Sequence, residues 1–342
     1  MSKTKLHKTY NLGLKLVILV LAYWAIYKQV FVNKNWTEIV SFFSEQYTLQ
    51  TLVFPITGII LMMPLNWGVE SIKWQYLIRK NEKISFFISL KGVFSGVTIS
   101  SMTPNRIGEY FGRVFILKKT HPVRGILMTI VGSISQLLVT VTVGGLALIF
   151  SLIRYPSLLN IDSLIIQILA IFSVLIILLV LAGVYFNIRI ISNIISWITR
   201  KWPKIRKFAN VFSYYNRIDL LKVFLYSFLR YLIFSLQFYF LLLVFHINVN
   251  LFEGYLIISL IFLGITVIPS VALAELGIRG SVALFVIENY FKARQMNPID
   301  GYELNIMAVS SILWLINIVL PAVIGSIFII NLSFFKNHKN GS

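Results

Sequence analysis

Apolar runs about as long as a bilayer is thick recur along this sequence, with basic loops between them. A helix needs about 20 apolar residues to cross a membrane, and six stretches reach that length, at about 12–32, 50–78, 124–153, 163–187, 222–246 and 305–331. Hydrophobic residues make up 58% of the 342 residues, which is more than a soluble core of this size can bury. The sequence therefore predicts an all-α polytopic membrane protein, with a single integral membrane domain over residues 1–342.

The basic loops constrain how the chain crosses the membrane. Short loops rich in Lys and Arg face the cytoplasm, and the most basic one spans residues 188–222. Both chain ends and the loops at 79–83 and 118–124 are basic as well. Full crossings by every apolar segment cannot place all of these loops on one side. Some segments must therefore enter and leave the membrane on the same side, and both termini are expected in the cytoplasm.

Two further apolar segments are interrupted by proline and resolve this conflict. Residues 86–117 can enter from the cytoplasm and return, turning near Pro104, while residues 252–290 enter from the outside and return, turning near Pro269. Broken backbone at membrane depth is tolerated only where protein covers it or where it lines a wet cavity. The expected fold has six full crossings and two opposed re-entrant hairpins, or eight helices if the hairpins are counted as spans. A cavity is expected between the hairpins.

The same path suggests an inverted repeat with halves 1–155 and 156–342. Each half would contain two helices, a hairpin and a final helix, with opposite orientations. Glu109 and Glu275 are 166 residues apart, as are the arginines that follow each of them by four residues. Inverted repeats with interrupted helices are a recurring plan of secondary transporters. Sequence identity at this offset is otherwise sparse, so a coincidental spacing is the alternative.

Charged residues stand in both hairpins, where the surrounding chain is almost wholly apolar. The segments are TPNRIGEYFGR at 103–113 and PSVALAELGIRG at 269–280, and their ionisable residues are Arg106, Glu109, Arg113, Glu275 and Arg279. A Glu and an Arg four residues apart share one helix face in each segment. A charge at the bilayer centre costs about 2.5–3.5 kcal/mol on insertion scales and usually faces a cavity or a charged partner. We expect the arginines to fork onto a phosphate while the glutamates keep the empty site neutral or contact a cationic head group. The alternative is that the pairs only clamp the hairpins.

Three polar residues of the second segment also share one helix face. Asn66, Glu70 and Lys73 follow one another at steps of four and three. They could line the same cavity, and Asn66 and Glu70 are candidate binding residues. The alternative for Lys73 is that it marks the cytoplasmic interface together with Trp67 and Trp74, because long cationic chains and aromatic rings settle there.

A polar and aromatic stripe in the segment 222–246 adds two candidates, Arg230 and Gln237. The stripe consists of Ser227, Arg230, Phe234 and Gln237. If the helix begins at Lys222, Arg230 lies about 12 Å inside it, so an interfacial anchor that snorkels to the membrane surface is the alternative. Single polar residues in membrane helices often serve helix packing, which makes weaker candidates of Gln136, Trp314 and Asn317.

The sequence carries no signature of catalysis or of a cofactor. The motifs GxSxG and GxxxxGK[ST] are absent. The chain has no Cys, and its four His residues are scattered, so no metal site is expected. The formal charge of +19 lies in loops, where positive-inside topology explains it without a nucleic-acid partner. We therefore expect no enzymatic activity, catalytic residue, metal, cofactor or nucleic-acid partner.

Four motifs of the chain, taken together, point to a known family. They are TPNRIGE at 103–109, the Pro–Gly–Arg segment at 269–279, Asn66-Trp67 with Lys73-Trp74, and Arg230-Tyr231 with Gln237-Phe238. Over essentially its full length the chain thereby resembles the flippase-like transmembrane domain of lysylphosphatidylglycerol synthases, a group that also occurs as stand-alone membrane proteins. Members commonly read PxxxGGxGxRE in the later motif. Here the acid after Arg279 is missing, and Glu275 replaces a small residue.

The resemblance implies transfer of an amphipathic lipid between the leaflets of the bacterial cytoplasmic membrane. The expected partner is a phospholipid or a polyprenyl-phosphate-linked lipid with an anionic or phosphate-bearing head group, and a homo-oligomer is compatible with the sequence. No segment corresponds to the soluble aminoacyl-transferase domain of full-length synthases, so synthesis of an aminoacylated lipid is not implied. The alternatives are an accessory protein or enzyme in lipid-linked glycan assembly and a small-solute secondary transporter.

Overall fold

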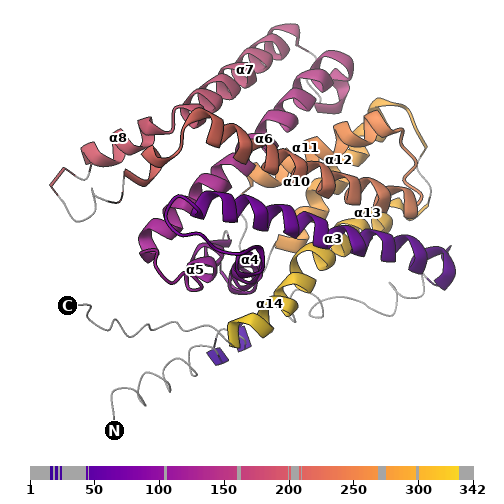
Figure 1. Cartoon of the computed structure of the whole chain (residues 1–342). Helices are drawn as coiled ribbons and strands as arrows, with labels where there is room; N and C mark the ends of the chain where they lie inside the picture. Colours follow the sequence, from indigo (N-terminus) through magenta and orange to yellow (C-terminus); the bar gives the residue numbers. More distant parts are fainter. Residues whose placement is uncertain are drawn as a thin grey trace, which may run out of the picture.

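The structure, a computed structural model, is helical throughout the part of the chain that it describes (Figure 1). That part comprises residues 46–103, 106–159, 163–198, 200–201, 208, 210–268, 275–297 and 300–330, and the single residues 16, 17, 20, 21, 24 and 44. The helices are α3 (Leu49–Ile78), α4 (Phe86–Ser100), α5 (Gly108–Val114), α6 (Pro122–Arg154), α7 (Leu164–Phe186), α8 (Arg189–Ile198), α10 (Arg217–Val244), α11 (Leu251–Val267), α12 (Glu275–Ala293), α13 (Tyr302–Trp314) and α14 (Leu320–Ile330). Short 3-10 turns lie at Pro156–Leu159 and Asn210–Tyr214.

Five helical stretches of the described chain are long and apolar enough to cross a membrane. They are Gln50–Ile78, Pro122–Arg154, Leu164–Phe186, Arg217–Val244 and Tyr302–Ile329. These stretches confirm five of the six predicted crossings. The sixth prediction, at 12–32, falls almost entirely outside the described residues. The chain is thus an all-α, multi-pass membrane protein.

Capping residues determine where the helices begin. The side chain of Ser85 caps α4, and that of Asn250 caps α11. Asn216 and Asp219 form a reciprocal capping box at the start of α10, because each side chain accepts the backbone N–H of the other. This cap starts α10 at Arg217, five residues before the start that the hydropathy predicted. The correction matters for the site, since it moves Arg230 deeper into the helix.

The helices α4 and α5 form one antiparallel hairpin, and α11 and α12 form another. In the first, the helices approach so closely that a Cβ on Gly112 would lie 2.5 Å from the Cα of Gly96, so only glycine fits there. In the second, Arg294 just after α12 binds Glu253 in the first turn of α11 at 3.2 Å. Glu253 also accepts the hydroxyl of Tyr155, at the end of α6, at 3.3 Å. The open end of this second hairpin therefore lies at the C-terminal end of α6.

The open end of the first hairpin lies at the opposite end of the bundle. The loop before α4 meets the loop before α6, where Asn81 donates to the hydroxyl of Thr120 at 3.0 Å. The two hairpins therefore enter the bundle from opposite ends, whereas their re-entry from opposite faces of a membrane stays a prediction. The predicted turns at Pro104 and Pro269 lie outside the described residues.

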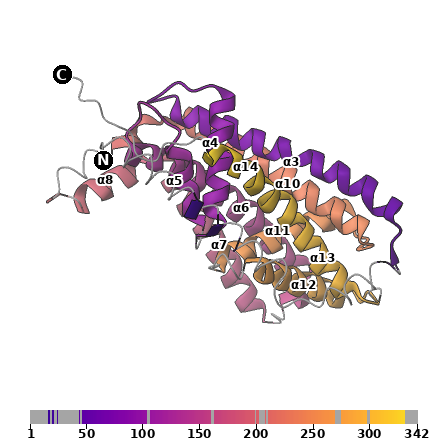
Figure 2. The ribbon, with the colours of Figure 1, turned by 90° about the horizontal axis from the view of Figure 1, so that it is seen from below.

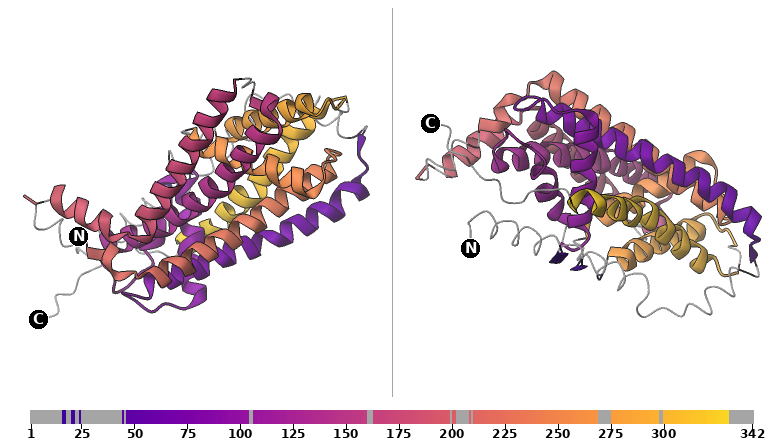
Figure 3. Two further views of the ribbon diagram at one scale, coloured as in Figure 1. Left: turned by 90° about the horizontal axis from the view of Figure 1, so that it is seen from above. Right: turned by 60° about the horizontal axis from the view of Figure 1, so that its bottom comes forward.

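The rest of the bundle packs around the hairpins. The long helices α3 and α10 run side by side in opposite directions (Figure 3). The helix α14 packs on α4 (Figure 2), and α6 packs on α11, so each hairpin is covered by the last helix of the other proposed half. The first contact is tight: a Cβ on Gly325 would lie 2.2 Å from the carbonyl oxygen of Phe94. The inverted repeat itself stays a prediction.

The basic loops gather at one end of the bundle. Lys80 binds Asp219 at 2.7 Å, which ties the loop after α3 to the start of α10. The hydroxyl of Tyr215 donates to the carbonyl of Leu77 at 3.1 Å across the same junction. The three basic segments near residues 80, 120 and 215 are therefore neighbours, as the opposed hairpins require. We call this region the basic end.

The segment 188–222, predicted as a loop, contains the short helix α8. Its apolar residues Ile190, Ile194, Trp197 and Ile198 recur at helical spacing and are exposed. The hydropathy scan missed α8 because ten residues are too few to register as a span.

A π-helical turn, Leu315–Val319, joins α13 to α14 within one span. Pro321 explains it, because proline lacks an N–H and its ring crowds the carbonyl four residues earlier, that of Asn317. Turns of this kind are frequent at functional sites. The turn places the side chain of Asn317 toward α3, where its Oδ1 accepts Nδ2 of Asn66 at 2.9 Å.

Candidate functional site

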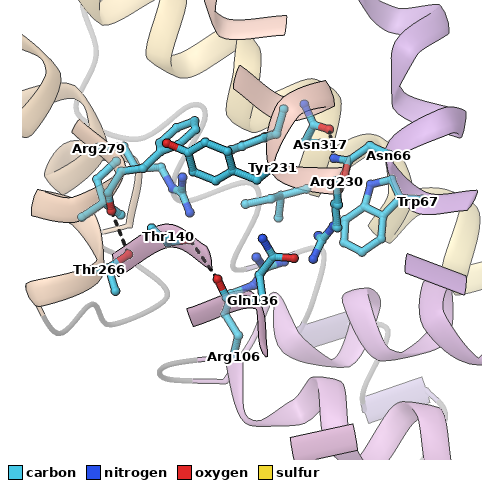
Figure 4. A pocket seen from close by; sticks show the side chains of 14 residues that line it. Asn66, Trp67, Arg106, Gln136, Thr140, Arg230, Tyr231, Thr266, Arg279 and Asn317 are labelled. Carbon is cyan, nitrogen blue, oxygen red and sulfur yellow. Dashed lines mark hydrogen bonds between the residues drawn. The ribbon is translucent and has the colours of Figure 1, made fainter. Parts of the chain in front are cut away.

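A cavity of about 290 Å³ lies inside the bundle (Figure 4). Its walls are built from both hairpins and from α3, α6, α10 and the π-helical turn. The lining residues are Asn66, Trp67, Arg106, Gln136, Thr140, Arg230, Tyr231, Phe234, Phe262, Ile265, Thr266, Arg279, Asn317 and Ile318. We refer to it as the central cavity.

The central cavity lies at mid-depth. Asn66, Gln136, Arg230 and Asn317 each stand near the middle of the membrane span that contains them. Arg230 is thirteen residues into α10, about 20 Å at the helical rise. Since a bilayer core is about 30 Å thick, these residues meet near its centre. Substrate sites of transporters with interrupted helices are found at this depth.

The hairpins contribute residues that flank their turns. Arg106 precedes α5, and Ile265 and Thr266 lie in the last turn of α11. Arg279 lies one turn into α12. The two hairpins therefore meet at this cavity from opposite ends, which agrees with the cavity that the sequence led us to expect.

Among the described residues, the lining of the central cavity contains three arginines and no carboxylate. Arg230 is held by α3: its Nε donates to Oδ1 of Asn66 and its Nη1 to Oε2 of Glu70, both at 3.1 Å. Its guanidinium also stands 4.8 Å from the centre of the Trp67 ring, a cation–π contact. Arg279 binds Oε1 of Glu275 through Nη2 at 2.7 Å and through Nε at 3.1 Å. Both arginines thus have one carboxylate partner outside the lining.

Arg106 differs from the other two arginines. It forms no ion pair within the described residues, and its Nη2 is buried without a hydrogen-bond partner there. Its backbone lies in the left-handed region, at φ 58°, which non-glycine residues seldom adopt. A buried guanidinium nitrogen without an acceptor is costly, so Arg106 has a donor that an anion in the cavity would satisfy.

A buried charge cluster lies behind the arginines, with Glu70 at its centre. Glu70 binds Lys73 at 2.7 Å, Arg113 at 2.8 Å and Arg230 at 3.1 Å. Arg113 also binds Glu109, its partner one turn earlier on α5. Side chains of Glu70, Lys73 and Arg113 are each at most 4% exposed. The cluster therefore contains two carboxylates, those of Glu70 and Glu109, and three cations, so its net charge is +1.

The predicted site residues thus separate into groups. Asn66, Arg106, Arg230 and Arg279 line the central cavity. Glu70, Glu109 and Arg113 form the cluster behind it, and Glu275 pairs with Arg279. Gln237 is apart from both: it is buried, and its Nε2 donates to the carbonyl of Ile59 at 3.0 Å.

Two alternatives from the sequence are wrong. Lys73 is not an interfacial anchor, because it is 1% exposed and binds Glu70 inside the bundle. Arg230 does not snorkel to a membrane surface, because its helix begins earlier than predicted and its guanidinium binds Asn66 and Glu70. Both residues are partners of the same buried carboxylate.

Sequence reasoning missed several lining residues, and only some carried a signal. Thr140 lies one helical turn after Gln136, so a polar stripe on α6 could have revealed it. Thr266 lies next to the predicted hairpin turn. Tyr231 and Phe262 resemble ordinary core aromatics in the sequence, and only the tertiary packing assigns them to the cavity wall.

The chain matches the model of a known protein family. The model of the lysylphosphatidylglycerol synthase TM region matches residues 12–295. The chain belongs to this family. The match includes every residue of the central cavity except Asn317 and Ile318. Neither curated proteins nor solved structures gave a match.

Membership of the lysylphosphatidylglycerol synthase TM family gives the chain a lipid-related role in the membrane. The family name refers to a lipid with a phosphate in its head group. The three arginines of the central cavity are the side chains best suited to such a group, because a guanidinium binds phosphate through two parallel hydrogen bonds.

Proposed function

We propose that this protein moves a lipid with a phosphate-bearing or otherwise anionic head group between membrane leaflets, without changing it chemically. The observation that carries the proposal is the meeting of Arg106, Arg230 and Arg279 at one mid-depth cavity, whose described lining residues include no carboxylate. A phospholipid or a polyprenyl-phosphate-linked lipid has the required head group. No cofactor is needed for binding of this kind.

The charge distribution suits a site that is alternately empty and filled. Charges at the bilayer centre are costly, and two of the three arginines each pair with a carboxylate outside the lining, Arg230 with Glu70 and Arg279 with Glu275. A phosphate would add the acceptor that Arg106 lacks. Since charge-assisted hydrogen bonds are stronger in a dry site than in water, the head group could leave its hydration shell there.

The size of the central cavity favours a head group rather than a whole lipid. A volume of about 290 Å³ is at the lower limit of small-molecule sites. Apolar side chains beside the hairpin turns are exposed, among them Ile107 at 48% and Val267 at 72%. We propose that these surfaces face the acyl chains, which stay in the bilayer while the head group crosses.

Re-entry of the hairpins is part of the proposal. The helix α4 has 15 residues, or about 22 Å, and α5 has 7 residues, or about 10 Å. Both are shorter than the bilayer core of about 30 Å, so a hairpin that dips in and returns fits better than two crossings. We place the basic end in the cytoplasm, in line with positive-inside topology, with the protein in the cytoplasmic membrane.

The test is lipid scrambling in proteoliposomes. Purified protein is reconstituted with a trace of fluorescent phosphatidylglycerol, and dithionite then measures how fast inner-leaflet label reaches the outside. Arg106→Ala should slow this movement about tenfold or more, because a charge-assisted hydrogen bond is worth about 1.5–3 kcal/mol. Arg294→Ala is the matched control, since Arg294 pairs with Glu253 at the far end. Equal rates for wild type and Arg106→Ala would refute the proposal.

The cavity volume also suits a small soluble anion, which makes small-solute transport the second candidate. The same vesicles, loaded with an organic phosphate and without labelled lipid, separate the two. If the solute leaves the vesicles as fast as labelled lipid moves, and if Arg106→Ala slows its release to the same extent, the second candidate is favoured.

A further inference from the structure

A second pocket, of about 670 Å³, lies at the basic end and shares no lining residue with the central cavity. It is formed by the loop between α3 and α4, the first turns of α4, the loop after α5 and the helix α14. Its lining residues are Asn81, Glu82, Lys83, Ile84, Ile88, Lys91, Ile116, Lys118, Lys119 and Phe328. We call it the basic groove.

Four lysines give the basic groove its charge. Lys83, Lys91, Lys118 and Lys119 are exposed, and none of them pairs with a carboxylate in the described part of the chain. Lysines that converge without counter-ions attract an anion from solution or from the membrane. The described lining also includes one acid, Glu82.

Glu82 is occupied by backbone groups. Its Oε1 accepts the N–H of Lys118 at 3.0 Å, and its Oε2 accepts the N–H groups of Lys119 and Thr120, both at 2.8 Å. The hydroxyl of Thr120 donates to the same oxygen at 3.0 Å. These bonds fix the backbone from which the side chains of Lys118 and Lys119 extend. Glu82 therefore shapes the groove, and because its one negative charge faces four lysines, the lining keeps a net charge of +3.

Part of the wall of the basic groove is apolar. Ile84, Ile88, Ile116 and Phe328 contribute to it, and Nζ of Lys91 stands 5.9 Å from the centre of the Phe328 ring. Phe87, next to this wall on α4, is 71% exposed. A lysine rim above an apolar wall suits an amphipathic anion better than free phosphate, because only the former has a part that the wall would bind.

The groove lies where helices end, at the level expected for head groups. The helix α3 ends at Ile78, α4 starts at Phe86 and α14 ends at Ile330. Basic pockets between membrane helices on the cytoplasmic side are known to hold acidic lipid head groups. The position at the helix ends, the charge and the apolar wall thus all favour an acidic lipid head group.

We propose that the basic groove binds the head group of an anionic glycerophospholipid of the leaflet at the basic end. The bound lipid bridges α4 and α14, with its phosphate among the lysines and the start of its acyl chains along Ile88 and Phe328. The site is separate from the central cavity, so it does not depend on the proposed transport.

The test is the thermal stability of the full-length protein in detergent micelles. Dioleoyl-phosphatidylglycerol or dioleoyl-phosphatidylcholine is titrated in, and the unfolding temperature is followed by intrinsic fluorescence. Phosphatidylglycerol should raise it well above the level reached with phosphatidylcholine. Lys118→Gln/Lys119→Gln should increase the phosphatidylglycerol concentration for half-maximal stabilisation roughly tenfold or more. The unfolding temperature of this variant with phosphatidylcholine alone should stay close to that of the wild type.

The matched control is Lys201→Gln/Lys222→Gln, which removes the same charge from exposed residues outside the groove. It should keep the wild-type response. If the Lys118/Lys119 variant fails to fold, Lys83→Gln/Lys91→Gln tests the opposite rim. An unchanged lipid response of the groove variant, an equal loss in the control, or full stabilisation by inorganic phosphate alone would each overturn the proposal.

Discussion

Glu70 holds three buried cations, which makes its carboxylate the most sensitive single group of the charge cluster. The substitution Glu70→Gln keeps the size of the side chain and removes its charge. Lys73, Arg113 and Arg230 then lose a partner that binds them at 2.7–3.1 Å in the wild type. Glu109 remains as the only carboxylate of the cluster, and the uncompensated charge rises from one to two.

The expected cost follows from the burial of this cluster. Removing one partner of a buried ion pair destabilises a protein by about 3–5 kcal/mol, because the remaining charge stays buried without compensation. Three cations share Glu70, and two of them, Lys73 and Arg113, are at most 3% exposed. We therefore expect a loss of at least about 3 kcal/mol. Glu288→Gln is the control, since its pair with Lys292 is exposed to solvent and such pairs contribute little to stability.

Unfolding in mixed micelles by increasing SDS measures the free-energy difference for each variant. A double-mutant cycle with Lys73→Met then isolates the pair, since removing both charges restores the balance of the cluster. The double variant should be more stable than the sum of the single losses predicts. If Glu70→Gln costs no more than Glu288→Gln, the cluster is not held together by this carboxylate, and the reasoning fails.

Two further predictions concern the hairpin and its loop. Gly112→Ala should destabilise the protein by about 2 kcal/mol or more, because its Cβ would lie 2.5 Å from the Cα of Gly96; Gly183→Ala, with open space around it, should be neutral or slightly stabilising in the same SDS titration. Burial raises the pKa of Glu82, but hydrogen bonds from the backbone of residues 118–120 outweigh it and hold this pKa below its usual value. Its contribution to stability is complete above the unfolded pKa of about 4.3 and is lost as the pH falls through the folded pKa. Thermal scans below pH 5 should therefore show a steeper loss for wild type than for Glu82→Gln, and parallel curves would contradict this role.

Hydropathy was sufficient to predict five of the membrane-spanning stretches. Apolar length determines the spans, because a helix in lipid must satisfy its own backbone. The basic loops then required two segments to turn back, and the described structure has two hairpins that open at opposite ends. The exact start of α10 depended on the capping box of Asn216 and Asp219, which a scan of hydropathy cannot detect.

The partners of each charged residue could not be predicted in the same way. Helical spacing correctly paired Glu109 with Arg113 and Glu275 with Arg279, because residues four apart share a helix face. The contacts of Glu70 with Arg113 and Arg230 join residues 43 and 160 positions apart. Such contacts depend on how α3 packs against α5 and α10, and no local pattern encodes that packing.

The same Glu–Arg spacing therefore serves two different purposes in the two hairpins. Arg113 binds two carboxylates and is buried behind the cavity, so the clamping interpretation fits it. Arg279 binds only its own helix partner and lines the cavity, as the proposed binding role requires. The difference comes from Glu70, which takes Arg113 out of the lining while it holds Arg230 within it. Arg106 forms no ion pair with a carboxylate among the described residues, and we propose that a head-group phosphate in the cavity accepts its hydrogen bonds. The number of carboxylates that each arginine binds thus indicates how available it is to a substrate. Arg113 is the least available and Arg106 the most.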